Sequence, residues 1–454
     1  MSFFFQNKEL NYLKLFLIIG LLINFTSISF NPEKLMNVEN IFKNFSLFGL
    51  INFLRGSITL IFFPIIFIIF LNYFKKKYLN KSNLIYFLFL SLFLIQLIAL
   101  FLSPNHNFYS YYLFNSFNII FITILSKSVL SEKEFTFLTT LSLALLILLF
   151  IYSGTLYLKG FFISHGNFYG SWNFIDQNEL IDIPRPTGLA RTCLIIFIFS
   201  TIYSTFNKNY NNLFIFLSIL SVTFIYLLSS RAILFVYILY LFFYIFNYCK
   251  NVNQIFKVLF RYILIPFILI ICLVFSKQVF KEKIEDKIFL KEGDSLNIFQ
   301  SLRIFPDLKR KEKVVDPVSP VNPKYIDFST GRIDDWKEIY AENKKVLYGN
   351  GAMGDRYLIK QTASNAIFYT YASSGYLGVF IFIIISLISF YFAALKIIKN
   401  RNRYDNPNQL ASAFVIIFLL MRSILETSYA IFSIDFIIFS LCFANITYMD
   451  THKK

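Results

Sequence analysis

The sequence predicts an all-α, polytopic membrane protein, and two observations carry the prediction. Of the 454 residues, 57% are hydrophobic and 20% aromatic, which is more apolar surface than a water-soluble domain of ordinary composition can bury. The apolar runs also repeatedly reach the roughly 18–20 residues that a helix needs to cross a bilayer. We therefore expect about 12 transmembrane helices together with a large, partly helical external loop.

The expected spans are apolar stretches separated by short polar or charged segments. They lie near residues 13–30, 57–74, 83–103, 109–127, 135–158, 192–206, 213–229, 232–248, 259–276, 374–396, 409–425 and 430–448. The first span has no small-residue cleavage site after it, so we expect a membrane anchor rather than a removed signal peptide.

These spans divide the chain into three parts. Residues 1–276 form an N-terminal membrane bundle of about nine spans, interrupted by a medium external loop over residues 159–191. Residues 277–373 form the large external (periplasmic) loop, which contains helices of its own, and residues 374–454 form a three-span segment with a short cytoplasmic tail. A proline-rich stretch within the large loop can hold little regular structure.

Basic residues are concentrated in the short loops on one side of the predicted membrane. The sequences of these loops are "FKKKYLNKSN", "CKNVNQIFKVLFR" and "KIIKNRNR". By the positive-inside rule these loops and both termini are cytoplasmic. The net charge of +17 is then explained by topology and by contact with anionic membrane lipid, so we expect no nucleic-acid partner.

Cysteine and histidine usage gives no sign of a metal site or a disulfide framework. The three histidines and four cysteines form no cluster at ligand spacing, so we expect no zinc. None of the cysteines falls in the large external loop, and we expect no disulfide there.

The stretch "FSTGRIDDWKEIYAENKKVLYGNGAMGD", residues 328–355, predicts a helix within the large loop. Ser329 or Thr330 can cap it, and an acidic pair follows in its first turn. Arg332 opposes the helix dipole at this end, unless an anion binds there to the free N–H groups and the guanidinium. Two interpretations stay open: a solvated arginine on a loop helix, and an arginine that contacts phosphate.

Further arginines are expected at the outer face. Arg185 and Arg191 precede the sixth span, in "PRPTGLAR", and Arg231 lies between the seventh and eighth spans with almost no loop around it. A charge so close to hydrocarbon needs a partner or must reach outward to water. Because guanidinium groups match phosphate oxygens in geometry and stay charged, a lipid-borne diphosphate is the natural ligand of such a set.

Two acidic residues near the last spans are candidate partners. Arg422 and Glu426 are four residues apart, which predicts an ion pair along one helix face. Asp435 in the last span is expected either to bind Arg231 or to reach the rim of the membrane.

The order of these motifs resembles the O-antigen polymerase and O-antigen ligase superfamily. The motifs are "RPTGLAR", "SSRAILF", "TGRIDDWKEIY", "YGNGAMG" and "SNAIFYTYASSGYLG", and their order and spacing match over roughly residues 180–380. The resemblance implies an integral-membrane glycosyltransferase at the outer face of the bacterial cytoplasmic (inner) membrane. Its donor and acceptor would be polyprenyl-diphosphate-linked oligosaccharides, and it would need no cofactor: neither a metal nor a nucleotide sugar.

The resemblance also implies roles for particular residues. Arg185, Arg231 and Arg332 would be catalytic and, together with Arg191, would bind the donor diphosphate and stabilise the leaving group. The further substrate contacts implied are Trp336, Ser364, Asn365, Tyr369 and Arg422.

The general base is left open. In ligase-like members the "SN" position usually reads His-Asn, with the histidine near the acceptor hydroxyl, whereas this chain has Ser364-Asn365. Asp182, Glu179 and His165 in the medium loop are the alternatives, because a base must reach the acceptor hydroxyl.

Three functions are therefore considered. The first is a polymerase that moves a glycan from its lipid diphosphate onto another lipid-linked repeat unit, with a separate chain-length regulator as a partner that the resemblance suggests. The second is a ligase that transfers the glycan to a lipid or protein acceptor. The third is a flippase or transporter for lipid-linked sugar, although charges at the outer rim and a long external loop are untypical of transporters.

Overall fold

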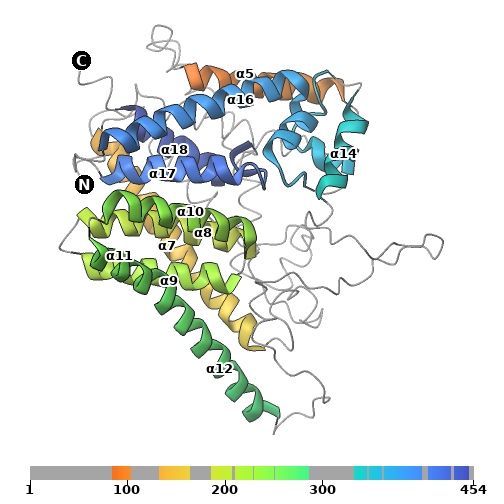
Figure 1. Ribbon diagram of the computed structural model, residues 1–454. Coiled ribbons are helices and arrows are strands. Elements are labelled where there is room, and N and C mark those ends of the chain that lie inside the picture. The colour runs from red at the N-terminus through yellow and green to blue at the C-terminus, as the bar shows by residue number, and fades with distance from the viewer. Residues whose placement is uncertain are drawn as a thin grey trace, which may run out of the picture.

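The computed structural model describes residues 84–103, 132–163, 186–206, 210–228, 230–249, 251–285, 332–344, 347–359, 362–400, 407–430 and 434–448. Every regular element in these ranges is a helix (Figure 1), in agreement with the predicted all-α class. The expected spans at 13–30, 57–74 and 109–127 lie outside the described residues.

Six helices of the described part are long and apolar enough to cross a membrane. Their apolar segments are Thr139–Leu158, Thr187–Phe206, Asn211–Leu228, Arg231–Tyr248, Val252–Lys277 and Ala366–Lys399. Three further apolar segments are shorter: Phe87–Leu102, Pro407–Arg422 and Ile438–Thr447. Many Phe, Leu and Ile side chains on these helices are exposed, as expected where a helix faces lipid. The protein is therefore an all-α, membrane-embedded protein.

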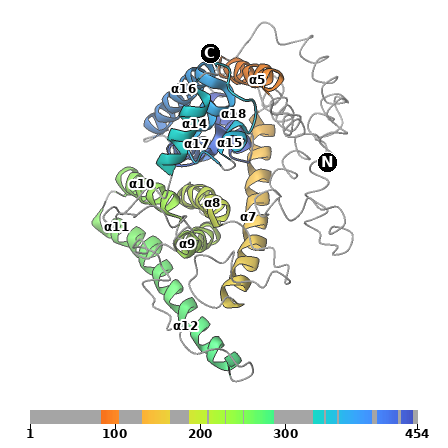
Figure 2. The same cartoon turned by 90° about the vertical axis from the view of Figure 1, so that its right-hand side faces the viewer.

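The helices pack as two groups, with one long helix in contact with both. The first group comprises α8 (Pro186–Phe206), α9 (Asn211–Leu228), α10 (Arg231–Tyr248), α11 (Val252–Leu259), the π-helical η5 (Phe260–Leu264) and α12 (Ile265–Glu285). The second comprises α5 (Leu84–Leu102), α14 (Arg332–Asn343), α15 (Gly354–Ile359), α16 (Ala366–Asn400), α17 (Pro407–Arg422), the short η6 (Ser428–Ala430) and α18 (Ile434–Tyr448). Helix α7 (Glu132–Ile163) packs on α8 and on α18, and α12 projects away from the rest at its far end (Figures 1 and 2).

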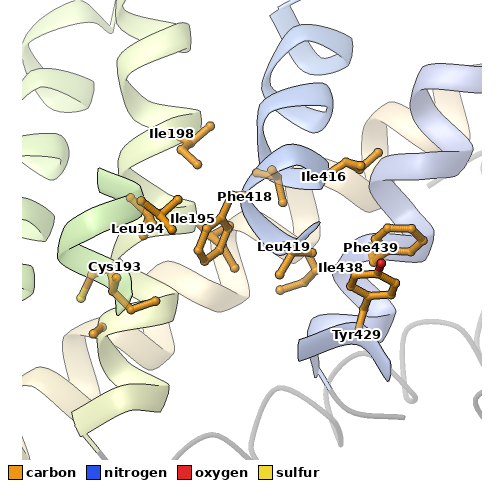
Figure 3. Close-up of a cluster of buried hydrophobic side chains, with 14 of the residues drawn as sticks. Cys193, Leu194, Ile195, Ile198, Ile416, Phe418, Leu419, Tyr429, Ile438 and Phe439 are labelled. Atoms are coloured by element: carbon orange, nitrogen blue, oxygen red, sulfur yellow. The ribbon is translucent and has the colours of Figure 1, made fainter. Parts of the chain in front are cut away.

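The core between the two groups lies where α8 packs on α17, which in turn packs on α18 (Figure 3). Its side chains are almost entirely aliphatic and aromatic, and Phe418 of α17 and Ile195 of α8 are at most 2% exposed. Tyr429 of η6 stacks on Phe439 of α18 with ring centroids 4.3 Å apart, which fixes the turn between α17 and α18 against the bundle.

Hydroxyl groups join the helices of the first group inside its apolar core. Tyr237 donates a hydrogen bond of 2.6 Å to the carbonyl oxygen of Tyr262, which lies in the π-helical turn η5. One turn further along α10, Tyr240 hydrogen-bonds Thr201 of α8 at 2.7 Å. Such bonds satisfy polar groups that lipid cannot and so hold membrane helices together.

Several predicted boundaries shift. Helix α8 begins at Pro186, not near residue 192, because proline suits the first position of a helix, where no N–H donor is needed. The medium loop therefore shrinks at both ends, since α7 continues to Ile163. The boundary expected at residue 276 also moves, because α12 continues to Glu285. Helix α16 begins at Ala366 and is broken at Gly375, close to the expected start of the tenth span at residue 374.

Candidate functional site

Three arginines and two carboxylates gather where α8, α14 and α18 begin and α17 ends. The members are Arg191, Arg332, Arg422, Glu426 and Asp435, and we call them the arginine cluster. The positive ends of the α8, α14 and α18 dipoles lie at this same place. Cations at helix N-termini are unfavourable by about 0.3–1 kcal/mol each unless anions accompany them, so the arrangement favours negative charge.

The deep part of the arginine cluster is a buried triad. Asp435 Oδ2 accepts a hydrogen bond from Arg422 Nη1, and Asp435 Oδ1 lies 3.0 Å from Arg191 Nη1, at an angle outside hydrogen-bonding geometry. The Asp435 side chain is 1% exposed, that of Arg422 8% and that of Arg191 12%. One carboxylate therefore faces two guanidinium groups, in an environment where an uncompensated charge is costly.

Arg191 and Arg422 each have one buried N–H donor that makes no hydrogen bond to the described residues. Within the described part of the chain, Nε of Arg191 and Nε of Arg422 are buried and have no hydrogen-bond acceptor. A buried N–H group without an acceptor costs about 1–3 kcal/mol. An anion that reached this triad would supply the missing acceptors and balance the remaining positive charge.

The outer part of the arginine cluster is more accessible. Arg332 Nη1 donates a hydrogen bond of 2.8 Å to the carbonyl oxygen of Leu425, and Arg332 Nη2 lies 3.5 Å from Glu426 Oε1. The side chains of Arg332 and Glu426 are 31% and 23% exposed. The sequence left open a freely solvated or a phosphate-contacting Arg332, and the structure shows a half-buried residue bound to the turn after α17.

Helix α14 is held in place along its length, and this positions Arg332. Trp336 donates from Nε1 to the carbonyl oxygen of Ala363 at 2.7 Å and stacks on Phe368 of α16, with ring centroids 5.2 Å apart. At the C-terminal end of α14, Asn343 donates to the carbonyl oxygen of Tyr371 at 2.6 Å.

The docking of Asn343 depends on a break in α16. At Gly375 the backbone has φ 62° and ψ −162°, a region that in practice only glycine occupies, so helical hydrogen bonding is interrupted there. The loop between α14 and α15 fills the gap, because Asn350 N–H donates to the carbonyl oxygen of Ala372 at 2.8 Å and Gly351 N–H to that of Ser373 at 3.0 Å. This pairing of loop and broken helix accounts for the "YGNGAMG" and "SSG" motifs.

The turn that carries Glu426 is fixed by the start of α16. Asn365 caps α16, since its Oδ1 accepts the N–H groups of Ile367 and Phe368 at 2.8 and 3.2 Å. The same side chain donates from Nδ2 to the carbonyl oxygen of Ile424 at 2.8 Å. The predicted substrate contact Asn365 thus caps α16 and holds the turn at Ile424, two residues before Glu426 of the arginine cluster.

A buried carboxylate supports the segment that receives Trp336. Asp355 Oδ1 accepts the N–H of Arg356 at 2.9 Å, and Asp355 Oδ2 accepts the N–H of Ala363 at 2.9 Å. Burial raises the pKa of Asp355 above its ordinary value, although these backbone hydrogen bonds act in the opposite direction.

The other predicted site residues fall in different places. Arg231 begins α10, is exposed and has no ion pair within the described ranges, so it does not join the arginine cluster. Tyr369 is fully buried and its hydroxyl accepts the N–H of Met353 at 3.5 Å. Ser364 precedes the α16 cap with φ 49°. The remaining predicted residues, Arg185, Asp182, Glu179 and His165, lie outside the described residues.

Two expected ion pairs are wrong. Arg422 does not pair with Glu426, because the Arg422 guanidinium binds Asp435 of α18 and the Glu426 carboxylate faces Arg332 of α14. Asp435 does not bind Arg231 or reach the rim, since it is buried between Arg191 and Arg422. The sequence therefore named every arginine of the arginine cluster but missed which carboxylate accompanies which arginine.

Together the fold and the arginine cluster define the class of the protein: an all-α, membrane-embedded protein with a largely buried group of arginines at its helix ends. In comparisons with protein-family models, with curated proteins and with solved structures, none matches the chain. A functional proposal therefore rests on the arginine cluster and on the sequence motifs.

Proposed function

We propose that the protein is an O-antigen or polysaccharide repeat-unit polymerase. It transfers a glycan from its polyprenyl diphosphate onto another lipid-linked repeat unit at the outer face of the bacterial cytoplasmic membrane. The observation that carries the proposal is the arginine cluster, in which, among the described residues, three guanidinium groups face two carboxylates at helix ends.

A lipid-linked diphosphate fits this position chemically. Its polyprenyl tail can remain in hydrocarbon while its headgroup lies at the level of the helix ends, beside Arg332. Guanidinium groups bind phosphate oxygens through pairs of parallel hydrogen bonds, and Nε of Arg191 and of Arg422 are donors without acceptors among the described residues. The excess positive charge and the unused donors support the same ligand.

The reaction is a displacement at the anomeric carbon of the donor sugar. The acceptor hydroxyl oxygen forms a bond to that carbon while the bond from the carbon to the diphosphate oxygen breaks, and the diphosphate takes the electron pair. Arginines held rigidly beside the diphosphate stabilise the charge that develops there, which lowers the barrier without a metal. The proton of the acceptor hydroxyl passes to a base, for which Asp182, Glu179 and His165 stay candidates.

The topology that accompanies this proposal has about 12 spans, with both termini in the cytoplasm and residues 277–373 largely in the periplasm. The active site then lies on the side of the membrane to which assembled repeat units are exported. A chain-length regulator is the protein partner that fits a polymerase of this kind.

Two alternatives are distinguished by particular residues. A ligase that passes glycan to a lipid or protein acceptor is less favoured, because Ser364 stands where the resemblance leads us to expect a histidine. A flippase or transporter for lipid-linked oligosaccharide is less favoured because the arginine cluster lies at helix ends, whereas transporters bind substrate near the middle of the bilayer.

The experiment that tests the proposal compares a strain lacking this gene with its parent. Surface polysaccharide is separated on a gel, and lipid-linked glycans are extracted in parallel. We expect the ladder to collapse to a single repeat unit on the acceptor. Long glycan stranded on the external lipid would indicate a ligase, and single units trapped on the cytoplasmic face would indicate a transporter; either result would contradict the proposal.

A further inference from the structure

We propose that Glu426 is a displaceable counter-ion: it neutralises Arg332 in the free protein and gives way when a diphosphate diester binds. This inference rests on the proposed function, since it concerns the ligand of the same arginine cluster. It is carried by the contrast between the two carboxylates of that cluster.

The Asp435 carboxylate is buried between two arginines, whereas the Glu426 carboxylate is partly exposed. The Asp435 side chain is 1% exposed and faces two guanidinium groups. Glu426 is 23% exposed, and its one ion pair among the described residues is with Arg332, at 3.5 Å. That separation is longer than the 2.7–2.9 Å typical of a charge-assisted hydrogen bond, and a part-exposed pair of this kind contributes little to stability. The Glu426 carboxylate can therefore leave at small cost, whereas the Asp435 carboxylate cannot.

Only the Glu426 side chain needs to move. The turn that carries it is fixed by the hydrogen bond from Asn365 to the carbonyl oxygen of Ile424 and by that from Ala366 N–H to the carbonyl oxygen of Ser423. Arg332 also stays in place, because its Nη1 is bound to the carbonyl oxygen of Leu425. When the Glu426 carboxylate rotates away, Arg332 Nη2 becomes available while the arginine keeps its orientation.

The charges match a diphosphate diester. Within the described part of the chain, and with both carboxylates in place, three arginines face two negative charges, which leaves one positive charge. Without the Glu426 carboxylate the balance is three against one, which leaves two positive charges. A diphosphate esterified at both ends carries two negative charges, whereas a phosphate diester carries one. Displacement of Glu426 therefore favours a diphosphate-linked glycan over a monophosphate-linked one.

Two matched ligands test this inference on the purified full-length protein in lipid nanodiscs. One is farnesyl diphosphate-linked N-acetylglucosamine and the other is farnesyl phosphate-linked N-acetylglucosamine, which differ by one phosphate and one negative charge. Binding is measured by calorimetry for the natural protein, for Glu426→Gln and for the control Glu338→Gln. Glu338 is an exposed carboxylate on α14 outside the arginine cluster, so its replacement changes the net charge equally.

We expect Glu426→Gln to bind the diphosphate ligand about tenfold more tightly, since the ion pair with Arg332 no longer has to be broken; tenfold corresponds to about 1.4 kcal/mol. The monophosphate ligand should gain less, and Glu338→Gln should behave as the natural protein. In an Arg332→Ala background the Glu426→Gln gain should shrink, because the two residues act on each other. Variants are first checked for a single folded species by size-exclusion chromatography.

Three other outcomes overturn the inference in different ways. Equal diphosphate affinity in the natural protein and in Glu426→Gln rejects the counter-ion and leaves the proposed function standing. Unchanged affinity together with lost glycan transfer assigns Glu426 as the base that accepts the acceptor proton instead. Failure of the natural protein to bind the diphosphate ligand rejects the anion site itself and with it the proposed function.

Discussion

Arg191 Nη1 lies 3.0 Å from Asp435 Oδ1, and this contact joins α8 in one helix group to α18 in the other. Asp435 also accepts a hydrogen bond from Arg422 of α17, so one buried carboxylate holds three helices together at their ends. Most of the surrounding interface is apolar, and apolar packing constrains the relative orientation of the helices only weakly. A buried ion pair instead specifies which helix ends meet.

Asp435→Asn should destabilise the protein by about 3–5 kcal/mol, because two buried guanidinium groups lose their shared negative charge. Thermal unfolding in detergent, followed by circular dichroism, measures the loss. Asp334→Asn is the control, since Asp334 is 81% exposed and only reaches Lys337 at 3.8 Å. A melting temperature for Asp435→Asn equal to that of the control would show that the triad is not a structural joint.

Gly375→Ala should destabilise the protein by about 3 kcal/mol or more. The backbone there has φ 62°, and a Cβ atom would lie 2.0 Å from the carbonyl oxygen of Leu347. The loop after α14 hydrogen-bonds the carbonyl oxygens at the break in α16. The variant should therefore also hold α14 less firmly, and limited proteolysis should cleave faster around α14. Gly154→Ala is the comparison, because the atoms nearest to its new Cβ belong to the side-chain ring of Phe224, at 3.1 Å, and not to the backbone. Similar stability of the two variants would contradict this account of the break.

Tyr237→Phe should cost about 1–2 kcal/mol, since the carbonyl oxygen of Tyr262 in the π-helical turn then loses its donor inside the bundle. Thermal unfolding in the same detergent, without added denaturant, measures the change. Tyr391→Phe removes an equivalent hydroxyl from a ring that is 59% exposed and should leave the melting temperature unaltered. Equal effects would mean that the hydroxyl of Tyr237 adds nothing to the packing of α10 on η5.

Asp355 should make stability fall as pH rises above about 3.8, its ordinary pKa. Burial raises the pKa of Asp355 in the folded protein, so between 3.8 and the folded value the unfolded chain has already released the proton that the folded chain keeps. In this window the unfolded chain binds fewer protons than the folded chain. The free energy of unfolding therefore decreases as pH rises. The contribution is fully present below 3.8 and is lost as pH rises through the folded pKa.

Asp355→Asn removes this titration, so its melting temperature should vary less between pH 3.5 and about 6 than that of the natural protein. Asp334→Asn, at an exposed site, should keep the natural slope. The overall stability of Asp355→Asn should also be lower at every pH, because an amide NH₂ cannot accept the N–H of Ala363. Parallel pH curves for Asp355→Asn and the natural protein would exclude Asp355 as the source of the slope.

The helical membrane fold was predictable because it follows from the length of apolar runs, which is a local property. The helix ends were less predictable. Arg191 was assigned to a loop, since a charge at the edge of an apolar run usually ends the span, yet Pro186 starts the helix and carries Arg191 into its second turn. The break at Gly375 had a signal in the glycines of "YGNGAMG" and "SSG", but its cause is a contact between segments more than 20 residues apart.

The composition of the arginine cluster was predictable in part. Arg332 stood out because a cation at a helix N-terminus opposes the dipole, Arg191 because it precedes a span in "PRPTGLAR", and Arg422 because of its spacing to Glu426. Their partners could not be derived, because the spacing of Arg422 and Glu426 permits an ion pair, whereas Arg422 binds Asp435 of α18 and Glu426 faces Arg332 of α14. The position of Asp435 between α8 and α17 depends on how three helices pack, which the sequence pattern does not specify.

Substitutions of Arg332 can distinguish a requirement for its positive charge from a requirement for the geometry of its guanidinium group. Its guanidinium bonds the carbonyl oxygen of Leu425 with one nitrogen and faces Glu426 with another, and a lysine has a single nitrogen that cannot do both. If the proposed polymerase is correct, Arg332→Ala should lower the rate of glycan transfer by about 10²–10³-fold, the loss typical when one group that stabilises developing charge is removed. Arg332→Lys should be intermediate, because the charge is kept and the fork is lost.

The measurement is polymer formation from lipid-linked repeat units by purified protein in nanodiscs, with Lys337→Ala as the control. Lys337 lies on the same helix, is 75% exposed, and its removal changes the net charge equally, so transfer should stay at the natural rate. Natural activity in both Arg332 variants would remove Arg332 from the mechanism. Equal loss in the alanine and lysine variants would mean that the two-nitrogen geometry, rather than the charge, is what transfer requires.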